Sequence, residues 1–161
     1  MPQNENPELS SPACWAHEAD DAYMGYASRD ELLAFLNELL EAERAGSRVT
    51  LRTAAEVSDA GTKALIEAVQ RDEAHWCGVL MKAIQTLNGE ASKRTGAFYE
   101  KAMAIPGLPE RLAFLNRGQG WVVRKLREML PRIRDDRIHH ELAEMLAAHE
   151  RNIALVEGRS V

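Results

Sequence analysis

The stretch SRDELLAFLNELLEAE, residues 28–43, decides the fold. It opens with Ser28 followed three residues later by Glu31, a capping box in which each side chain bonds the other residue's backbone N–H at the start of a helix. Leucines then recur at the three- and four-residue spacing of one helical face: Leu32, Leu33, Leu36, Leu39 and Leu40. Glu43 continues this apolar stripe, about 20° from its centre at 100° per residue. The stretch therefore predicts an amphipathic helix with a carboxylate on its buried face.

Three more segments show the same helical periodicity. The first helix is expected to continue to about Val57 and to be ended by Gly61. The remaining long helices are predicted over residues 62–87, 109–130 and 135–157, and the long crossover between the second and third carries a short helical turn at 98–103. Two helical hairpins joined by a long crossover predict an all-α chain folded as an antiparallel four-helix bundle over residues 28–161.

Residues 1–27 lack this periodicity and are rich in Pro, Ser, Asn and Asp. They are predicted to form an extended N-terminal arm that packs on the bundle. Its apolar anchors are expected to be Trp15, Tyr23, Met24 and Tyr26. Cys14-x-x-His17 has the spacing of a metal-ligand pair, but one pair without a second is a weak zinc signal, and a packed arm is favoured.

Length and composition exclude several classes of protein. A chain of 161 residues is long enough for one well-buried core and short for two. A net charge of -5 argues against general nucleic-acid binding, and no apolar run approaches the roughly 20 residues that span a bilayer. The two cysteines do not make a disulfide framework, and the N-terminus does not resemble a signal peptide. We therefore expect a cytoplasmic protein that binds neither membrane nor nucleic acid.

The charge is unevenly distributed. Residues 1–60 hold 12 acidic and 4 basic side chains, whereas residues 111–137 hold 8 basic and 3 acidic ones. Either the acidic and basic helices lie side by side and neutralise each other, or the third helix offers a docking surface to an acidic protein partner. The cations of that surface are Arg117, Arg124, Lys125 and Arg127. Trp121 lies opposite the apolar stripe of the same helix, so it either covers the arm or joins a homodimer interface.

Every long helix carries a polar side chain on or beside its apolar stripe. In the second helix Asp72 and Glu73 straddle the stripe, about 50° to either side, while Gln119 and His149 lie within about 20° of the centre of theirs. With Glu43 they lie near the middle of their helices, and the midpoints of antiparallel helices meet at one level. An unpaired polar group in a core costs roughly 2–7 kcal/mol, so this level indicates either a shared network or a bound ion.

Gly118 and Gly120 flank Gln119 inside a helix, where each Gly costs roughly 1 kcal/mol relative to Ala. They indicate close packing, room for a side chain, or a small-molecule cavity beside Gln119.

Three segments at this level resemble the ferritin-like superfamily in its broad, rubrerythrin-type sense. They are Leu39-Leu-Glu-Ala-Glu-Arg-Ala-Gly46, Arg71-Asp-Glu-Ala-His75 and His149-Glu150. The resemblance is closer still to an uncharacterised bacterial group described as a domain of unknown function. It implies a ferritin-like bundle with a di-iron or di-manganese centre, held by one Glu from each of two helices and a Glu-x-x-His motif from each of the other two. Glu43 matches the glutamate of the first helix.

The sequence departs from that ligand set at the other helices. Asp72-x-x-His75 has the Glu-x-x-His spacing, but with a shorter acid and a histidine on the flank of its helix. Gln119 stands where the third helix would supply a glutamate. Leu146, three residues before His149, leaves the second Glu-x-x-His motif incomplete.

Three interpretations of the level therefore stay open. It is a metal-free network in an interaction or regulatory module, with Glu43 accepting hydrogen bonds from Gln119 and His149. It is a single-metal site for Fe, Mn or Zn, with His149, Glu43 and either Glu73 or Asp72 as ligands and Gln119 adjacent. Or the chain is a di-iron or di-manganese oxidoreductase of the rubrerythrin type.

Overall fold

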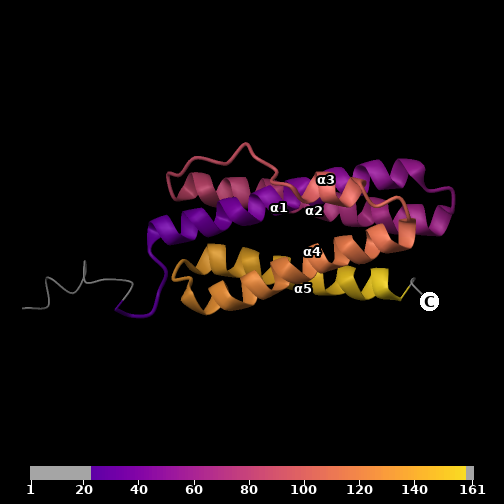
Figure 1. Cartoon of the computed structure of the whole chain (residues 1–161). Coiled ribbons are helices and arrows are strands. Elements are labelled where there is room, and N and C mark those ends of the chain that lie inside the picture. Colours follow the sequence, from indigo (N-terminus) through magenta and orange to yellow (C-terminus); the bar gives the residue numbers. More distant parts are fainter. Residues whose placement is uncertain (1–22, 159–161) are drawn as a thin grey trace, which may run out of the picture.

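The computed structural model describes residues 23–158, and within that range the chain forms helices, turns and loops but no strand. The four long helices in Figure 1 are α1 (Arg29–Glu56), α2 (Ala60–Thr86), α4 (Leu108–Met129) and α5 (Asp136–Glu157). A short helix, α3 (Phe98–Met103), lies in the crossover where the sequence predicts one, and the 3-10 turn η2 (Leu130–Arg132) extends α4. The prediction of an all-α chain is confirmed.

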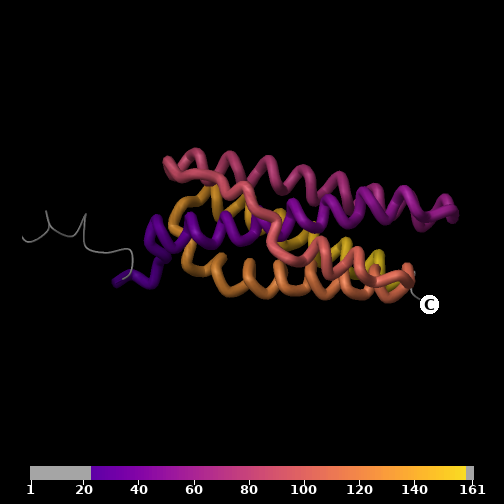
Figure 2. Tube along the Cα trace, turned by 45° about the horizontal axis from the view of Figure 1, so that its top comes forward, coloured from indigo at the N-terminus to yellow at the C-terminus, as the bar shows by residue number. Residues whose placement is uncertain are grey.

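The long helices form two antiparallel hairpins, α1 with α2 and α4 with α5, which lie side by side along their lengths (Figures 1 and 2). From the end of α2 the crossover runs back beside α1 to α3, which contacts both α1 and α4. Side chains of α1 fix this path. Asn37 Nδ2 donates to the Glu90 carbonyl at 3.0 Å, and Arg44 Nη1 donates to the carbonyls of Ser92 and Arg94, each at 2.8 Å. The crossover is therefore held against one face of the two hairpins.

Part of the predicted arm lies outside the described residues, including Cys14, Trp15 and His17. Two of the other expected anchors are exposed, Tyr23 at 87% and Met24 at 69%, so the prediction was wrong for them; Tyr26 is half-buried. The chain instead reaches the helices at Ala27, which is buried and whose N–H donates to the carbonyl of Arg132 at 2.8 Å.

The start of α1 forms the predicted capping box. Ser28 Oγ accepts from the N–H of Glu31 at 3.1 Å. The Glu31 carboxylate interacts with the backbone of Ser28 in return, and it also accepts from both terminal nitrogens of Arg132, at 2.6 and 2.9 Å. This pairing lowers the pKa of Glu31 and ties the first turn of α1 to η2.

The end of α1 differs from the prediction. The helix stops at Glu56, and Asp59 caps α2 by accepting from the N–H of Thr62 at 2.7 Å. Gly61 therefore lies in the first turn of α2 and does not end α1. An aspartate with a free backbone N–H three residues ahead is a strong helix start, and it decides the boundary over the weaker stop signal of the glycine.

The leucines of the opening stretch build the main core. Leu36, Leu39 and Leu40 are fully buried, and each contributes roughly 1.5–3 kcal/mol by leaving water. They pack in one cluster with apolar residues of the other three long helices, among them Leu80, Leu126, Leu142 and Met145. The α1 residues of this cluster all precede Glu43, so the cluster lies to one side of the polar level.

Three ion pairs join the acidic α1 to the basic α4 and η2: Glu31 with Arg132, Glu38 with Lys125, and Glu56 with Arg111. Arg127, another cation of the predicted docking surface, pairs with Glu150 of α5. This pattern favours mutual neutralisation of the helices; a docking surface for an acidic partner stays a prediction. In the described region no helix is both long enough and apolar enough to cross a membrane.

Candidate binding pocket

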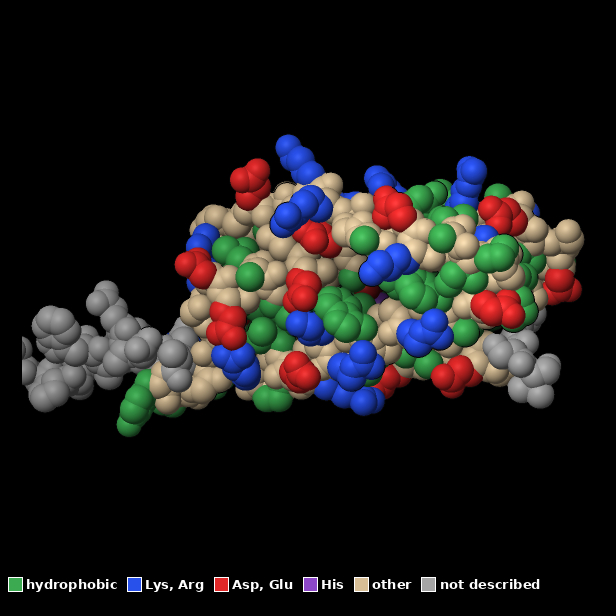
Figure 3. Space-filling view, viewed as in Figure 1, with side chains coloured by type: hydrophobic (Ala, Val, Ile, Leu, Met, Phe, Trp, Pro, Cys, Tyr) green, Lys and Arg blue, Asp and Glu red, His purple; other side chains and the backbone are tan. Residues whose placement is uncertain are grey.

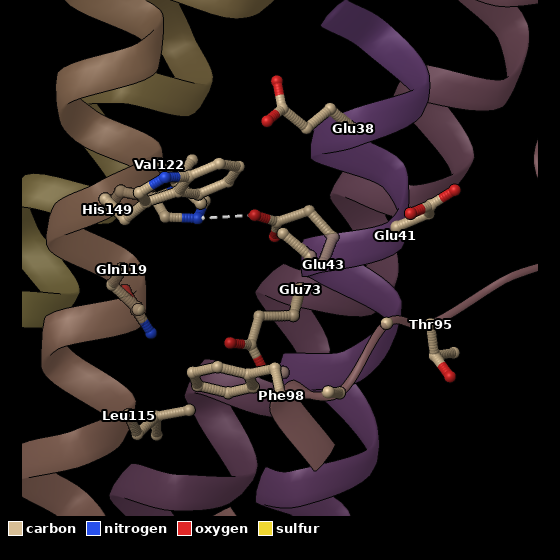
Figure 4. A pocket seen from close by; sticks show the side chains of 16 residues that line it. Glu38, Glu41, Glu43, Glu73, Thr95, Phe98, Leu115, Gln119, Val122 and His149 are labelled. Atoms are coloured by element: carbon tan, nitrogen blue, oxygen red, sulfur yellow. Dashed lines mark hydrogen bonds and ion pairs between the residues drawn. The ribbon is translucent and has the colours of Figure 1, made fainter. Parts of the chain in front are cut away.

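A cavity of about 330 Å³ lies between α1, α4 and the start of α3, at the predicted polar level. Its buried end, here called the polar floor, consists of Glu43, Glu73, Gln119 and His149, each at most 3% exposed. Its walls are mostly apolar and include Phe98, Leu115, Trp121 and Val122. Glu38 and Glu41 of α1, whose side chains are partly exposed, lie at its mouth (Figure 4). Figure 3 shows hydrophobic side chains near the middle of this face, with a histidine visible in a depression between them.

Glu43 and His149 form a buried pair across α1 and α5. His149 Nε2 lies 2.9 Å from Glu43 Oε1, and Nδ1 lies 3.0 Å from the carbonyl oxygen of Met145 (Figure 4). The carbonyl can only accept, so Nδ1 carries a hydrogen. Burial acts to lower the pKa of His149, but the charge of Glu43 and the hydrogen bonds to Glu43 and Met145 outweigh it, and the pKa is raised. The raised pKa favours an imidazolium that donates to the Glu43 carboxylate; a hydrogen bond from His149 to Glu43 belongs to one of the three interpretations that the sequence left open.

Glu73 of α2 is the second buried carboxyl group of the floor. Its Oε2 accepts from the hydroxyl of Thr50 at 3.0 Å. Burial is the main cause that raises its pKa well above the usual value, and the charges of Glu43 and Asp72 act in the same direction. The Thr50 hydrogen bond opposes this rise but does not cancel it. These causes together favour the neutral acid form of Glu73.

Gly46 makes room for this carboxyl group. A Cβ at Gly46 would overlap Glu73 Oε1, so only a residue without a side chain lets α1 pass so close to Glu73. The sequence shows this glycine in the segment from Leu39 to Gly46, but its purpose depends on which α2 residue faces it.

Gln119 of α4 faces the floor from the other side. Figure 4 shows its amide pointing across the cavity toward Glu73. Within residues 23–158, neither its Nε2 nor its Oε1 has a hydrogen-bond partner, and Glu43 Oε2 also lacks one. The predicted hydrogen bond from Gln119 to Glu43 is not formed. Three buried polar atoms of the floor are thus left without a partner by the protein itself.

Asp72 does not belong to the pocket. It accepts from Asn152 Nδ2 of α5 at 3.0 Å and does not line the cavity. The helical wheel placed Asp72 and Glu73 equally far from the stripe and could not separate these roles. His75 is exposed, as its position on the flank predicts, and its ring meets Trp76 edge-on at 4.7 Å.

Gly118 makes room for Phe98, one residue of the cavity wall. A Cβ there would lie 2.7 Å from Phe98 Cε2, so the glycine gives the Phe98 ring of α3 its place against α4. Phe98 also stacks on Phe114, with ring centroids 4.9 Å apart. Sequence reasoning left open what the glycine makes room for. It missed Phe98 as a wall residue, because a contact between the crossover and α4 leaves no periodic signal.

The donors of the floor fit a metal ion poorly. Among the described residues, no three His, Cys, Asp or Glu side chains form a group that could hold one. His149 has no free ring nitrogen, since both are engaged with Glu43 and Met145. A di-metal centre fits less well still, because Gln119 and Leu146 replace two of the acids it requires. The site is chemically a polar, partly unsatisfied cavity rather than a ligand cage.

No curated protein and no solved structure matches the chain. Residues 30–158, which cover α1 to α5, match one protein family throughout. The chain belongs to the family described as Domain of unknown function (DUF6306).

Proposed function

We propose that this chain is a ferritin-like four-helix bundle whose polar midplane has become a metal-free binding pocket for a small organic molecule. The observation that carries this proposal is the set of unpartnered atoms on the polar floor, namely Glu43 Oε2 and both amide atoms of Gln119 within the described residues. An unsatisfied buried polar group costs about 1–3 kcal/mol, so a ligand that supplies the missing hydrogen bonds gains affinity from them.

The cavity has the size and composition of a ligand site. Its volume of about 330 Å³ lies in the range of roughly 300–1,000 Å³ that is usual for small-molecule pockets. Apolar walls with a few convergent polar groups are also typical of such sites. Gly46 and Gly118 keep Glu73 and Phe98 in place around it, so the cavity exists before a ligand arrives.

A purely structural network accounts for only part of the floor. The pairs Glu43–His149 and Asp72–Asn152 join α5 to α1 and α2 and hold it in register, but Glu43 Oε2 has no partner in the described residues. Gln119 forms no such pair with another helix. A buried polar network with unsatisfied members is less stable than an apolar core.

The replacement Gln119→Leu separates the two explanations. If Gln119 serves a ligand, the leucine removes two unsatisfied atoms, and the free energy of unfolding in urea rises by about 1–3 kcal/mol. If Gln119 serves the fold, the same change lowers it. Gln70→Leu is the control, because Gln70 Nε2 has a partner in Ser47 Oγ at 3.3 Å and its loss gives no such gain.

Binding is tested with 2-phenylethanol, whose ring suits the apolar walls and whose hydroxyl both donates and accepts. Titration into the isotope-labelled full chain should shift the amide NMR signals of residues around Gln119 and Phe98. The same titration of Gln119→Leu should give weaker shifts, since the hydroxyl loses its partner. Absence of any shift in wild-type protein at millimolar probe contradicts the proposal.

A single-metal site is the second candidate, because Glu43, Glu73 and His149 all line one pocket with Gln119 adjacent. These residues would hold Fe, Mn or Zn only if His149 released Glu43, and the metal would then polarise a bound oxygen ligand. The test is reconstitution of untagged protein with each divalent ion, followed by dialysis and metal analysis. Retention of about one equivalent by wild type but not by Glu43→Ala supports the metal site, and sub-stoichiometric metal excludes it.

A further inference from the structure

Most of the titratable residues that line the pocket are acidic. Among its described lining residues are four glutamates and one histidine, and neither lysine nor arginine. The two glutamates at the mouth have cationic neighbours, since Glu38 pairs with Lys125 at 3.2 Å and Glu41 with Arg94 at 3.4 Å. The two on the floor do not meet any lysine or arginine in the described contacts. A negatively charged ligand would therefore face carboxyl groups with no free cation to receive it.

His149 does not change this balance. It is the one basic group of the lining, and both of its ring nitrogens are engaged, with Glu43 and with the Met145 carbonyl. The Glu43–His149 pair is neutral as a unit. The carboxyl group left to balance a ligand charge is that of Glu73, whose one described hydrogen bond comes from Thr50.

Most of the unpartnered atoms on the polar floor are acceptors, so they need a hydrogen-bond donor from the ligand. Glu43 Oε2 and Gln119 Oε1 can only accept, and the Glu73 carboxyl group lies across the cavity from Gln119 (Figure 4). A protonated amine brings two or three N–H donors on one atom, and charge-assisted hydrogen bonds are about twice as strong as neutral ones. One ammonium group between Gln119 and Glu73 would satisfy the two unpartnered acceptors, Glu43 Oε2 and Gln119 Oε1; Gln119 Nε2 is itself a donor and would need an acceptor elsewhere.

The walls favour the same ligand. Phe98 and Trp121 offer aromatic rings, and an aromatic ring attracts a cation over its face. Trp121 already attracts a cation of the protein itself, since Lys125 Nζ lies 5.3 Å from its ring centroid. Leu115 and Val122 complete an apolar surface that a hydrocarbon body would cover.

Resting on the proposed binding pocket, we propose that its ligand is an organic cation: a protonated amine on a compact apolar or aromatic body. The ammonium group lies on the polar floor between Glu73, Gln119 and Glu43, and the apolar body lies against Phe98, Leu115 and Val122. The bound ammonium group favours the charged form of Glu73, whose carboxyl group releases its proton to solvent on binding and then supplies the counter-charge.

The test compares three probes that share a phenyl ring and differ in the head group. Phenethylamine is cationic, 2-phenylethanol is neutral and phenylacetate is anionic at neutral pH. Each is titrated calorimetrically into the full chain. Phenethylamine should bind at least about tenfold more tightly than 2-phenylethanol, a difference of about 1.4 kcal/mol, and phenylacetate should bind most weakly.

The variant Glu73→Gln keeps the shape of the side chain and removes its charge. It should weaken phenethylamine binding by about tenfold and leave 2-phenylethanol binding nearly unchanged. Glu144→Gln is the matched control, because Glu144 is an exposed carboxylate on α5 outside the pocket. That variant should bind all three probes like wild type. Circular dichroism of each variant verifies that the helices are intact.

The outcomes distinguish this inference from the proposed function. Equal affinity for the amine and the alcohol, or tighter binding of phenylacetate, overturns the cation inference and leaves the small-molecule pocket standing. An equal loss of amine and alcohol affinity in Glu73→Gln overturns it as well. If none of the three probes binds, both the cation inference and the proposed pocket are wrong.

Discussion

The polar level has two sides, and they differ in how completely the protein satisfies them. On the α5 side, His149 pairs with Glu43 and Asn152 with Asp72, so each polar side chain reaches a partner on another helix. On the α4 side, Gln119 faces Glu73 across a cavity and has no partner within residues 23–158. The difference shows that polar residues at one depth of a helical core need not share a purpose. Completed pairs fix the packing of helices, and under the proposed function the uncompleted ones mark where a ligand binds.

The largest expected effect on stability comes from removing the buried hydrogen bond between Glu43 and His149 on the α5 side. Glu43→Ala leaves His149 buried without its partner, and the loss of one member of a buried ion pair costs about 3–5 kcal/mol. The urea midpoint should fall accordingly, and the tertiary signal of Trp76 and Trp121 should be lost at lower urea. The control is Glu144→Ala, which removes an exposed carboxylate from α5. A loss of stability below about 1 kcal/mol for Glu43→Ala would show that the pair contributes little.

The same pair and Glu73 predict how stability depends on pH. The folded state raises the pKa of both His149 and Glu73, so it binds more protons than the unfolded chain. The stabilisation from His149 is complete below its ordinary pKa of 6.5 and is lost as the pH rises through the raised value. The stabilisation from Glu73 is lost upward from 4.5. Urea unfolding between about pH 5 and 8 should show stability falling with pH, and Glu73→Gln should flatten the slope.

Most of the helices could be predicted from the sequence, because caps and apolar spacing are local signals. The error at Gly61 arose where two local signals compete, and Asp59 prevails since it supplies a hydrogen bond to Thr62. The burial of Glu43, Gln119 and His149 follows from the helical wheel in the same way.

The pocket itself could not be predicted. Asp72 and Glu73 lie equally far from the stripe, and only the neighbouring helix decides that one meets Asn152 and the other the cavity. Phe98 comes from the crossover, whose path depends on contacts far away in the sequence, such as Arg44 with Ser92.

A change on the unsatisfied side should have an intermediate effect. Gly46→Ala places a Cβ on Glu73 Oε1, so the Glu73 carboxyl group must move into the cavity or α1 must shift. We expect a loss of about 1–3 kcal/mol in the free energy of unfolding. Binding of 2-phenylethanol should weaken as well, because the displaced carboxyl group occupies part of the pocket. Unchanged stability would show that Glu73 is not confined against α1.

The smallest expected effect is a gain at the second glycine beside Gln119. Around Gly120, the nearest described atom to an added Cβ is Arg124 Nη1 at 3.7 Å, which is ordinary contact with the end of a flexible side chain. Gly120→Ala should therefore stabilise the protein by about 0.5–1 kcal/mol through the helix propensity of alanine. It should leave the pocket unchanged, since Gly120 does not line it.

The neighbouring Gly118→Ala must instead displace the Phe98 ring, so it should lower stability and weaken probe binding. If both alanines have the same effect on unfolding in urea, Phe98 does not depend on Gly118. If Gly120→Ala alone weakens probe binding, the pocket extends to a side of α4 that the present lining does not include.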